Sequence, residues 1–198
     1  DVIVHTGVRV DEAIIREEAP DALILALGAK PLILPVPGIH NSNVLIGADL
    51  TEDSVLGNQI VVIGGGLVGC EQALHIARDG HQVVILEMQE DLATDCVVTH
   101  RENLMHQLQS CDRIQILTGA RCTEITDTGV KVDRGGKEET IAADTVVLAA
   151  GMKADSEQVN QLRSIVPQTY VIGDCNQAGK IMRAVRDAYD AVVDFGLF

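Results

Sequence analysis

The sequence has few aromatic side chains, few basic side chains and no tryptophan. Aromatic residues make up 2% of its 198 positions, and 15 lysines and arginines stand against 29 aspartates and glutamates, for a formal net charge of −14. Nucleic acids and anionic membrane surfaces bind concentrated positive charge, which this composition does not supply. We therefore expect no nucleic-acid or membrane partner, and a small ligand or another protein remains as the candidate partner.

Long apolar runs are also missing. No stretch reaches the roughly 20 residues with which a helix crosses a bilayer. The first residues, Asp1 to Val4, carry neither a basic leader nor a signal-type apolar segment. Hydrophobic residues still make up 46% of the chain, enough to fill the core of one large domain or two small ones. The sequence predicts a globular protein located in the cytoplasm.

Paired cysteine motifs are absent as well. The five cysteines are widely spaced without a Cys-x-x-Cys, and the six histidines are scattered. Reduced, mostly buried thiols are the default interpretation, and a dithiol reductase is the alternative. We expect no metal site and no side chain that acts covalently in catalysis.

What the sequence does contain is a glycine-rich turn between an apolar strand and a helix, within Gln59–Glu71. Gly64 can make the tight turn, Gly66 lets the backbone approach a pyrophosphate, and Gly69 allows close packing of helix on strand. The helix start offers free N–H groups and a positive dipole end. The predicted phosphate-binding residues are Gly64, Gly65, Gly66, Leu67, Val68 and Gly69.

The flanks of this turn favour a dinucleotide site over a turn that serves packing alone. Apolar residues recur from Cys70 to Ala77 at helical spacing, and Gly80 is placed to end the helix. A second strand, Gln82–Leu86, leads to Glu87, about 20 residues past the glycines, where a carboxylate accepts hydrogen bonds from an adenosine ribose. Because an acid there repels a 2′-phosphate, NADH is predicted over NADPH.

The remaining segments predict an α/β fold. Before the glycine turn we expect a strand at Val2–His5, a helix around Val10–Glu18, a buried strand within Pro20–Ala29 and a proline-rich connector at Lys30–Ile39. After Glu87 we expect a helix at Val97–Gln109, a strand at Gln115–Leu117, and short strands of period two at Cys122–Ile125, Val130–Asp133 and Glu139–Ile141, the last two joined as a hairpin.

The last part of the chain repeats an earlier pattern. A buried strand within Asp144–Met152 ends in a glycine, as the strand before Gly28 does, and the run Tyr170–Cys175 is a strand ending in Gly-Asp. A final helix should present one apolar face, made of Ile181, Ala184, Val185, Ala188 and Val192. The expected fold is Rossmann-like and three-layered, a parallel sheet with a three-stranded antiparallel element.

Together these segments resemble the two-dinucleotide-binding-domain flavoprotein reductases, in which an NAD(P)H domain is inserted into an FAD domain. Leu25–Ala29 and Leu148–Met152 are similar to the family's two Ala-Thr-Gly segments, with Leu27 and Ala150 in place of its threonine. Tyr170–Asp174 is similar to its FAD-contacting Gly-Asp motif.

Two sequence motifs, GGGLVGCE at Gly64–Glu71 and the segment Gly173–Ile181, are most similar to one branch of that family. This branch is the NADH:flavin oxidoreductase, 2-enoate reductase and 2,4-dienoyl-CoA reductase group related to old yellow enzyme. Its members begin with a barrel that carries FMN and an iron–sulfur cluster. Neither the barrel nor a first FAD fingerprint is found here, so we expect a fragment: an NAD(H) domain over 51–152, flanked by partial FAD-binding segments at 1–50 and 153–198.

The resemblance also implies roles for individual residues. Glu71 would lie near the nicotinamide, with a helix acid stabilised by the dipole as the alternative. Asp174 would bind the ribityl chain of FAD, with an ordinary cap or turn residue as the alternative. The other residues implied to lie beside the cofactors are Gly28, Ala29, Gly151, Gly173, Lys180 and Ile181.

The implied activity is the transfer of hydride from NADH to FAD, with electrons passed on through the cluster and FMN to an activated carbon–carbon double bond. Here the cofactors carry the chemistry and the protein positions them. The missing barrel would be a partner, and exposed apolar edges could produce a homo-oligomer. Two other hypotheses stand beside this one: an isolated NAD(H)-binding module without turnover, and a non-catalytic interaction domain that kept the fold.

Overall fold

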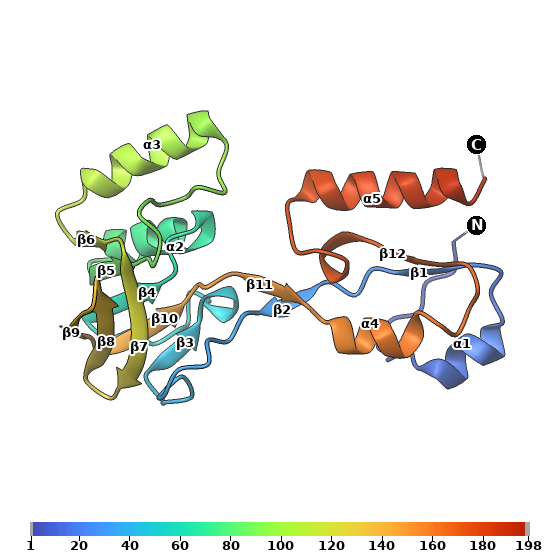
Figure 1. Ribbon diagram of the computed structural model, residues 1–198, viewed down its shortest axis with the longest axis horizontal. Helices are drawn as coiled ribbons and strands as arrows, with labels where there is room; N and C mark the ends of the chain where they lie inside the picture. Colours follow the sequence, from blue (N-terminus) through green and yellow to red (C-terminus); the bar gives the residue numbers. More distant parts are fainter. Residues whose placement is uncertain (1, 197–198) are drawn as a thin grey trace. The chain divides into compact units, whose positions relative to one another are not determined.

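The computed structural model describes residues 2–196. The chain forms two compact units (Figure 1). One, the central unit, is Pro31–Gly151; the other, the terminal unit, is built from both ends of the chain, up to Lys30 and from Met152 onward. In residues 2–196, no helix is both long enough and apolar enough to cross a bilayer.

The core of the central unit is a five-stranded sheet in the order β3-β10-β4-β5-β6, with every neighbouring pair parallel. Its strands are β3 (Val44–Ile46), β4 (Gln59–Ile63), β5 (Gln82–Leu86), β6 (Ile114–Leu117) and β10 (Thr145–Leu148). Val61, Val62 and Ile85 are completely buried, as expected for parallel strands that are covered on both faces.

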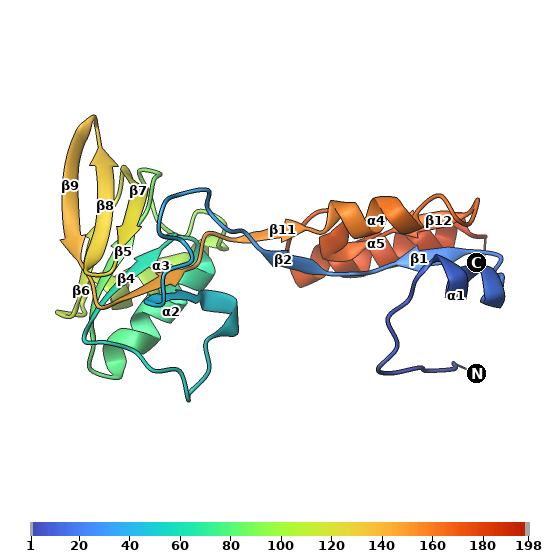
Figure 2. The same ribbon diagram turned by 90° about the horizontal axis from the view of Figure 1, so that it is seen from below.

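The central unit has three layers (Figure 2). Helices α2 (Leu67–Arg78) and α3 (Val98–Gln109) cover one face through a cluster that includes Ala73, Leu104 and Ile85. An antiparallel sheet covers the other face and consists of β7 (Ala120–Thr126), β8 (Gly129–Arg134) and β9 (Lys137–Ala142). The predicted three-layer α/β fold with an antiparallel element is confirmed.

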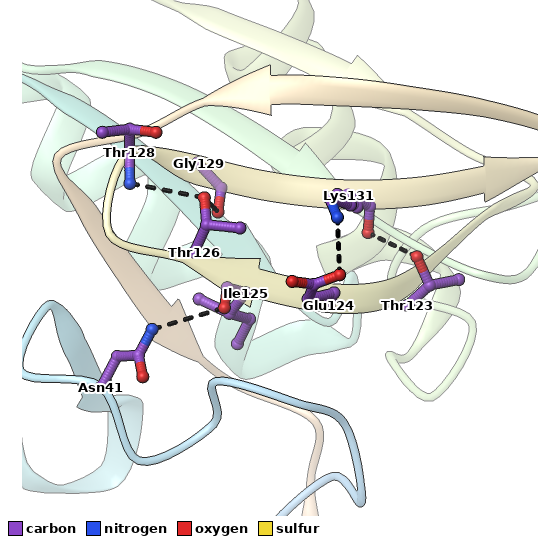
Figure 3. Close-up of polar contacts among 8 residues, drawn as sticks. All are labelled: Asn41, Thr123, Glu124, Ile125, Thr126, Thr128, Gly129 and Lys131. Atoms are coloured by element: carbon purple, nitrogen blue, oxygen red, sulfur yellow. Dashed lines mark hydrogen bonds and ion pairs between the residues drawn. The ribbon is translucent and has the colours of Figure 1, made fainter.

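Side-chain hydrogen bonds hold the β7–β8 hairpin (Figure 3). Thr126 Oγ1 donates to the Gly129 carbonyl at 3.1 Å across the turn. Lys131 Nζ lies 2.7 Å from Glu124 Oε2, and this hydrogen bond raises the pKa of Lys131. Asn41 Nδ2 donates to the Ile125 carbonyl at 3.4 Å, and the Ile125 N–H donates to the Pro37 carbonyl at 2.8 Å, which ties the proline-rich connector to β7.

The terminal unit has two small sheets and a core of its own. Strand β1 (Leu23–Leu25) pairs in parallel with β12 (Thr169–Val171), and β2 (Ala29–Pro31) pairs with β11 (Met152–Ala154). Its helices are α1 (Glu12–Glu18), α4 (Ser156–Leu162) and α5 (Ile181–Asp194), and a 3-10 turn, η2, spans Gly173–Cys175. Its core is made of Ile15, Leu25, Val159, Leu162, Val166 and Cys175.

Asp155 organises part of this unit. Its side chain caps α4 by accepting from Gln158 N, and it forms an ion pair with Lys30 of β2. The hydrogen bond from Lys30 lowers the pKa of the Asp155 carboxyl. The cap and the ion pair therefore join α4 to the β2–β11 ribbon.

Several sequence predictions for the terminal unit were wrong. Val2–His5 is not a strand, because no strand in the described part of the chain pairs with it, and Val2 is 89% exposed. The first helix begins at Glu12 rather than near Val10, because Asp11 accepts from Ile14 N and caps the helix there.

The apolar face predicted for α5 is also divided between two sides. Ala184, Ala188 and Val192 are half-buried, whereas Ile181 and Val185 are 84% and 63% exposed. The two alanines let the helix approach the unit closely, while Ile181 and Val185 point away from it. Strands β2, β3 and β11 and helix α4 were not predicted, and β2 takes in the first two residues of the segment predicted as a connector.

Candidate functional site

A large cleft of the central unit lies at the carboxyl ends of its parallel strands. It has a volume of about 740 Å³ and includes the glycine turn, the residues after β5, the start of β7 and the end of β10. Its lining includes Gly64, Gly65, Gly66, Leu67, Val68, Glu87 and Gly151. In open α/β sheets, ligands bind in a crevice at this end of the strands. The structure thus brings most of the predicted nicotinamide-dinucleotide residues together around one cleft.

Two of the glycines are required by the fold itself. Gly64 has φ 113°, in the region that favours glycine, and a Cβ on it would overlap the carbonyl of Ala149 at the end of β10. A Cβ on Gly69 would overlap the carbonyl of Gly64, where α2 approaches β4. Their conformation and packing explain these two glycines without any ligand.

Gly66 has no such explanation. Its φ is −68°, which any residue adopts, and the nearest atom to a Cβ built on it is Asp95 Oδ1 at 3.7 Å. The Cβ would project into the cleft. Glycine at this position therefore fits a ligand whose phosphates approach the backbone closely, and the residues present fit a dinucleotide.

Gly66 is the N-cap of α2 and supplies no side-chain cap. Leu67 and Val68 begin the helix, where backbone N–H groups lack intrahelical acceptors. The Leu67 N–H donates instead to Asp95 Oδ1 at 2.9 Å. This helix start can hold an anion, and in this structure the anion is a carboxylate of the chain.

Glu87 lies directly beside the glycine turn. Its Oε2 accepts from Gly65 N at 2.6 Å, and its Oε1 accepts from Gln89 N at 2.8 Å. An ionised carboxylate has about four lone-pair sites on two oxygens, so capacity for two ribose hydroxyls remains after these bonds. The backbone bonds fix the carboxylate at the edge of the cleft.

Glu71 lies one turn into α2, on its exposed side. His100 Nε2 of α3 is 3.6 Å from Glu71 Oε1, so the two form an ion pair when the imidazole is protonated. Glu71 is not part of the cleft lining. Within the central unit, the structure therefore places Glu71 at the α2–α3 contact.

The thiol of Cys70 lies behind the glycine turn. It is completely buried and donates to the Gly65 carbonyl at 3.3 Å. Burial, and then the negative charges of Asp95 and Glu87, raise its pKa to about 12. The thiol is therefore protonated near neutral pH and is not a nucleophile there.

All five cysteines are free thiols, and Cys122 is also buried, with its pKa raised by burial to about 11. Among residues 2–196, no cluster of His, Cys, Asp and Glu side chains could hold a metal ion.

The residues implied for flavin binding lie in the terminal unit, apart from Gly151. Gly28 and Gly173 have φ of 73° and 64° and lie three residues after β1 and two residues after β12. Asp174 Oδ1 accepts from Gly179 N at 3.1 Å, in the turn that leads to α5.

Lys180 is the N-cap of α5, and Ile181 is its first residue, 84% exposed. Ala29 begins β2 directly after Gly28. Gly151 has φ 102°, and its carbonyl accepts from Leu32 N at 2.9 Å.

Sequence reasoning missed three parts of the cleft lining. They are the loop after β5, the start of β7 and the proline-rich connector, with Asp91, Thr94 and Asp95, with Arg121 and Thr123, and with Leu32, Leu34, Pro35 and Val36. The Ala120 N–H donates to the Glu87 carbonyl at 2.9 Å, which brings β7 to the cleft. No spacing rule marks these residues, because a tertiary contact places each of them.

Comparison with known proteins agrees with this architecture. The chain is 32% identical to a cinnamate reductase of Clostridium sporogenes over 89% of its own length and 27% of that protein's. It is 35% identical to an NADH oxidase of Thermoanaerobacter brockii, over 95% of this chain and 30% of that protein. The chain therefore spans about a third or less of the length of these two relatives.

Among solved structures, a 2-naphthoyl-CoA reductase in complex with 2-naphthoyl-CoA is similar, with a TM-score of 0.81 and 32% identity over 92% of this chain and 28% of that one. The family described as pyridine nucleotide-disulphide oxidoreductase matches residues 4–191. With the glycine turn, the carboxylate beside it and the three-layer unit in their expected places, the chain belongs to the pyridine nucleotide-disulphide oxidoreductase family.

Proposed function

We propose that the cleft of the central unit binds NADH, and that the chain is the segment of a flavin-dependent oxidoreductase that passes hydride from NADH to FAD. The observation that carries this proposal is Gly66. Neither its backbone conformation nor its packing requires a glycine, and Gly66 lines the cleft. Glycine is also a common N-cap residue, but a bare backbone at this point of the cleft is what a dinucleotide phosphate needs in order to approach the helix start.

The chain's own residues would divide the work of holding the dinucleotide. The amides that begin α2, at Leu67 and Val68, would donate to the pyrophosphate, and Glu87 would accept from the adenine ribose. Glu71 lies outside the cleft lining, beside His100, so the nicotinamide role proposed for it requires a dinucleotide that extends beyond the cleft along α2. When NADH and FAD are bound, the nicotinamide supplies a hydride and the flavin accepts it.

The terminal unit would contribute to FAD binding. Asp174 has one oxygen engaged by Gly179 N, and an ionised carboxylate can accept further bonds from ribityl hydroxyls. The backbone at the exposed start of α5, at Lys180 and Ile181, would face the flavin ring, with Gly28, Ala29 and Gly173 as close-approach positions in this unit. Gly151, in the central unit, would be a close-approach position beside a cofactor there. In domain terms, 51–152 would be the NAD(H) domain, and 1–50 and 153–198 would be parts of an FAD domain.

For the whole protein we propose reduction of an activated carbon–carbon double bond, of an enoate or an enoyl-CoA. The cinnamate reductase and the 2-naphthoyl-CoA reductase, both 32% identical to the chain, support this class. FMN and an iron–sulfur cluster would belong to a barrel domain outside this sequence. A cytoplasmic location remains a prediction from the sequence.

The test is reduction of flavin by NADH. The purified chain is mixed with FAD, free flavin is removed, and NADH is added without oxygen while the visible flavin absorbance is followed. We expect retained flavin and loss of its absorbance with NADH. Binding of NADH without retained flavin would instead support an isolated binding module. A folded chain that binds neither dinucleotide would support the interaction-domain hypothesis and contradict the proposal.

A further inference from the structure

The start of α2 is already occupied by an anion that the chain supplies. Asp95 Oδ1 accepts the Leu67 N–H at 2.9 Å, and the same oxygen is the atom nearest to a Cβ built on Gly66. The N-cap Gly66 has no side chain to do this. A carboxylate from a distant loop therefore stands where the proposed function places a phosphate of the dinucleotide.

The fold fixes the loop that carries Asp95. Ala93 N donates to the Gly65 carbonyl at 2.7 Å, and both Leu92 and Ala93 are 1% exposed. Ala93 has φ 49°, a left-handed conformation that is strained for alanine. Arg101 of α3 donates to the Leu92 carbonyl at 2.8 Å. Asp95 is thus presented to α2 by a buried, strained turn rather than by a loosely held surface segment.

The negative charges around the glycine turn also make Asp95 and a pyrophosphate competitors. The charges of Asp95 and Glu87 both act on the buried Cys70 thiol behind the turn. A pyrophosphate brought to Leu67 would add negative charge beside both carboxylates, and it would need the N–H that Asp95 uses. The Asp95 side chain lies at the exposed side of this contact, so it can move aside without leaving a buried charge unpaired.

We propose that Asp95 is a specificity-determining residue of the cleft, whose carboxylate holds the phosphate position of α2 until the phosphates of a nucleoside diphosphate displace it. This inference rests on the proposed function, because it requires a dinucleotide in the cleft. The bond between Asp95 and Leu67 would therefore lower the affinity for every ligand that must displace it. Ligands with a diphosphate displace Asp95, and ligands that reach only the ribose position at Glu87 leave it in place.

The experiment compares ligands with and without phosphates. Wild type, Asp95→Ala and Asp95→Asn are titrated calorimetrically with NADH, with ADP-ribose and with adenosine. Asp53→Asn serves as the control, because it removes the same charge from an exposed position outside the cleft lining. Amide hydrogen exchange at Leu67 reports whether the bond to Asp95 has been lost in each variant.

We expect Asp95→Ala to bind NADH and ADP-ribose about 3- to 10-fold more tightly, the range of one net hydrogen bond. Adenosine affinity should not change. Asp95→Asn should lie between wild type and Asp95→Ala, because its amide oxygen still accepts from Leu67 but carries no charge. In wild type, ADP-ribose should speed exchange in the loop around Asp95 by releasing it.

Other results would overturn the inference. Unchanged or weaker binding of ADP-ribose by Asp95→Ala would show that the carboxylate does not compete with phosphate, and so would an equal gain for adenosine. If wild type binds NADH but the affinities of the variants do not differ as expected, only the inference about Asp95 is contradicted. If no variant binds any dinucleotide while slow amide exchange at Cys70, whose N–H donates to the Gly66 carbonyl, shows a folded α2, the proposed function is contradicted and the inference with it.

Discussion

At the scale of single residues, the site consists of backbone amides and carboxylates that compete for them. Glu87 accepts from two backbone N–H groups, and Asp95 accepts from a third at the start of α2. These bonds organise the glycine turn before any ligand binds. Recognition of NADH would therefore be an exchange of hydrogen-bond partners more than a filling of empty space.

Glu87 should decide which dinucleotide binds. In Glu87→Arg the acceptor for ribose hydroxyls is lost and a cation is placed where a 2′-phosphate would lie. Because a hydrogen bond to a charged group contributes about 1.5–3 kcal/mol, NADH affinity should fall by about tenfold or more and NADPH affinity should rise. Titration calorimetry with both nucleotides measures this.

Glu87→Gln is the matched control for that variant. It keeps an acceptor for Gly65 N and adds no cation, so it should weaken NADH binding without a gain for NADPH. The ribose assignment would be wrong if the preference of Glu87→Arg for NADH over NADPH equalled that of wild type. Melting curves of the variants show whether the altered turn still folds.

At the scale of elements, the sequence predicted correctly the helices and strands that depend on local residue patterns. Strand β4, helix α2 and strand β5 follow from an apolar run, a glycine turn and helical spacing, and all three lie where they were expected. The hairpin between β8 and β9 was predicted for the same reason: Gly135 and Gly136 adopt φ of 63° and 83°, which the two-residue turn requires.

Elements that depend on distant partners were predicted poorly. Val2–His5 has strand-like residues but no strand beside it in the described part of the chain, so it stays irregular. The position of Asp95 could not be predicted, because it depends on how the loop after β5 folds back on Gly65. Only the outcome of tertiary packing reveals such a contact.

Helix α5 exposes an apolar face to solvent. Its large apolar side chains lie mostly on one exposed side, which we call the apolar α5 face: Ile181, Met182, Val185, Tyr189 and Val193, between 41% and 84% exposed. Exposed apolar surface of this kind favours association.

We expect the purified chain to self-associate through the apolar α5 face as its concentration rises. Met182→Gln with Val185→Gln should reduce the association, since glutamine keeps helix propensity and removes apolar surface. Light scattering after size-exclusion chromatography, over a range of loading concentrations, gives the mass. A monomer mass that does not change with concentration in wild type would contradict this expectation, and Val97→Gln, an exposed apolar site in the central unit, controls for general solubility.

At the scale of the whole molecule, the two units divide the proposed work. The central unit has a complete three-layer architecture with its own cores and a cleft at the strand ends. The terminal unit has only paired short strands, one small core and an exposed helix face. We therefore expect NADH binding to be a property of the central unit, and flavin binding to be the more demanding function.

The central claim is that Gly66 is a glycine because a dinucleotide approaches it. Its most direct test is calorimetric titration of NADH into wild type and into Gly66→Ala, with Gly69→Ala as the contrasting variant. Because φ at Gly66 is −68° and its Cβ position is open, Gly66→Ala should fold and lose only the small difference between a glycine and an alanine N-cap, about 1 kcal/mol or less. Gly69→Ala should be destabilised, because its Cβ would overlap the Gly64 carbonyl.

The account predicts that wild type binds one NADH per chain. It also predicts that Gly66→Ala loses about tenfold in affinity, since an intruding methyl group costs about 1–3 kcal/mol. Equal NADH affinity in wild type and Gly66→Ala, or no NADH binding by a folded wild-type chain, would contradict the account.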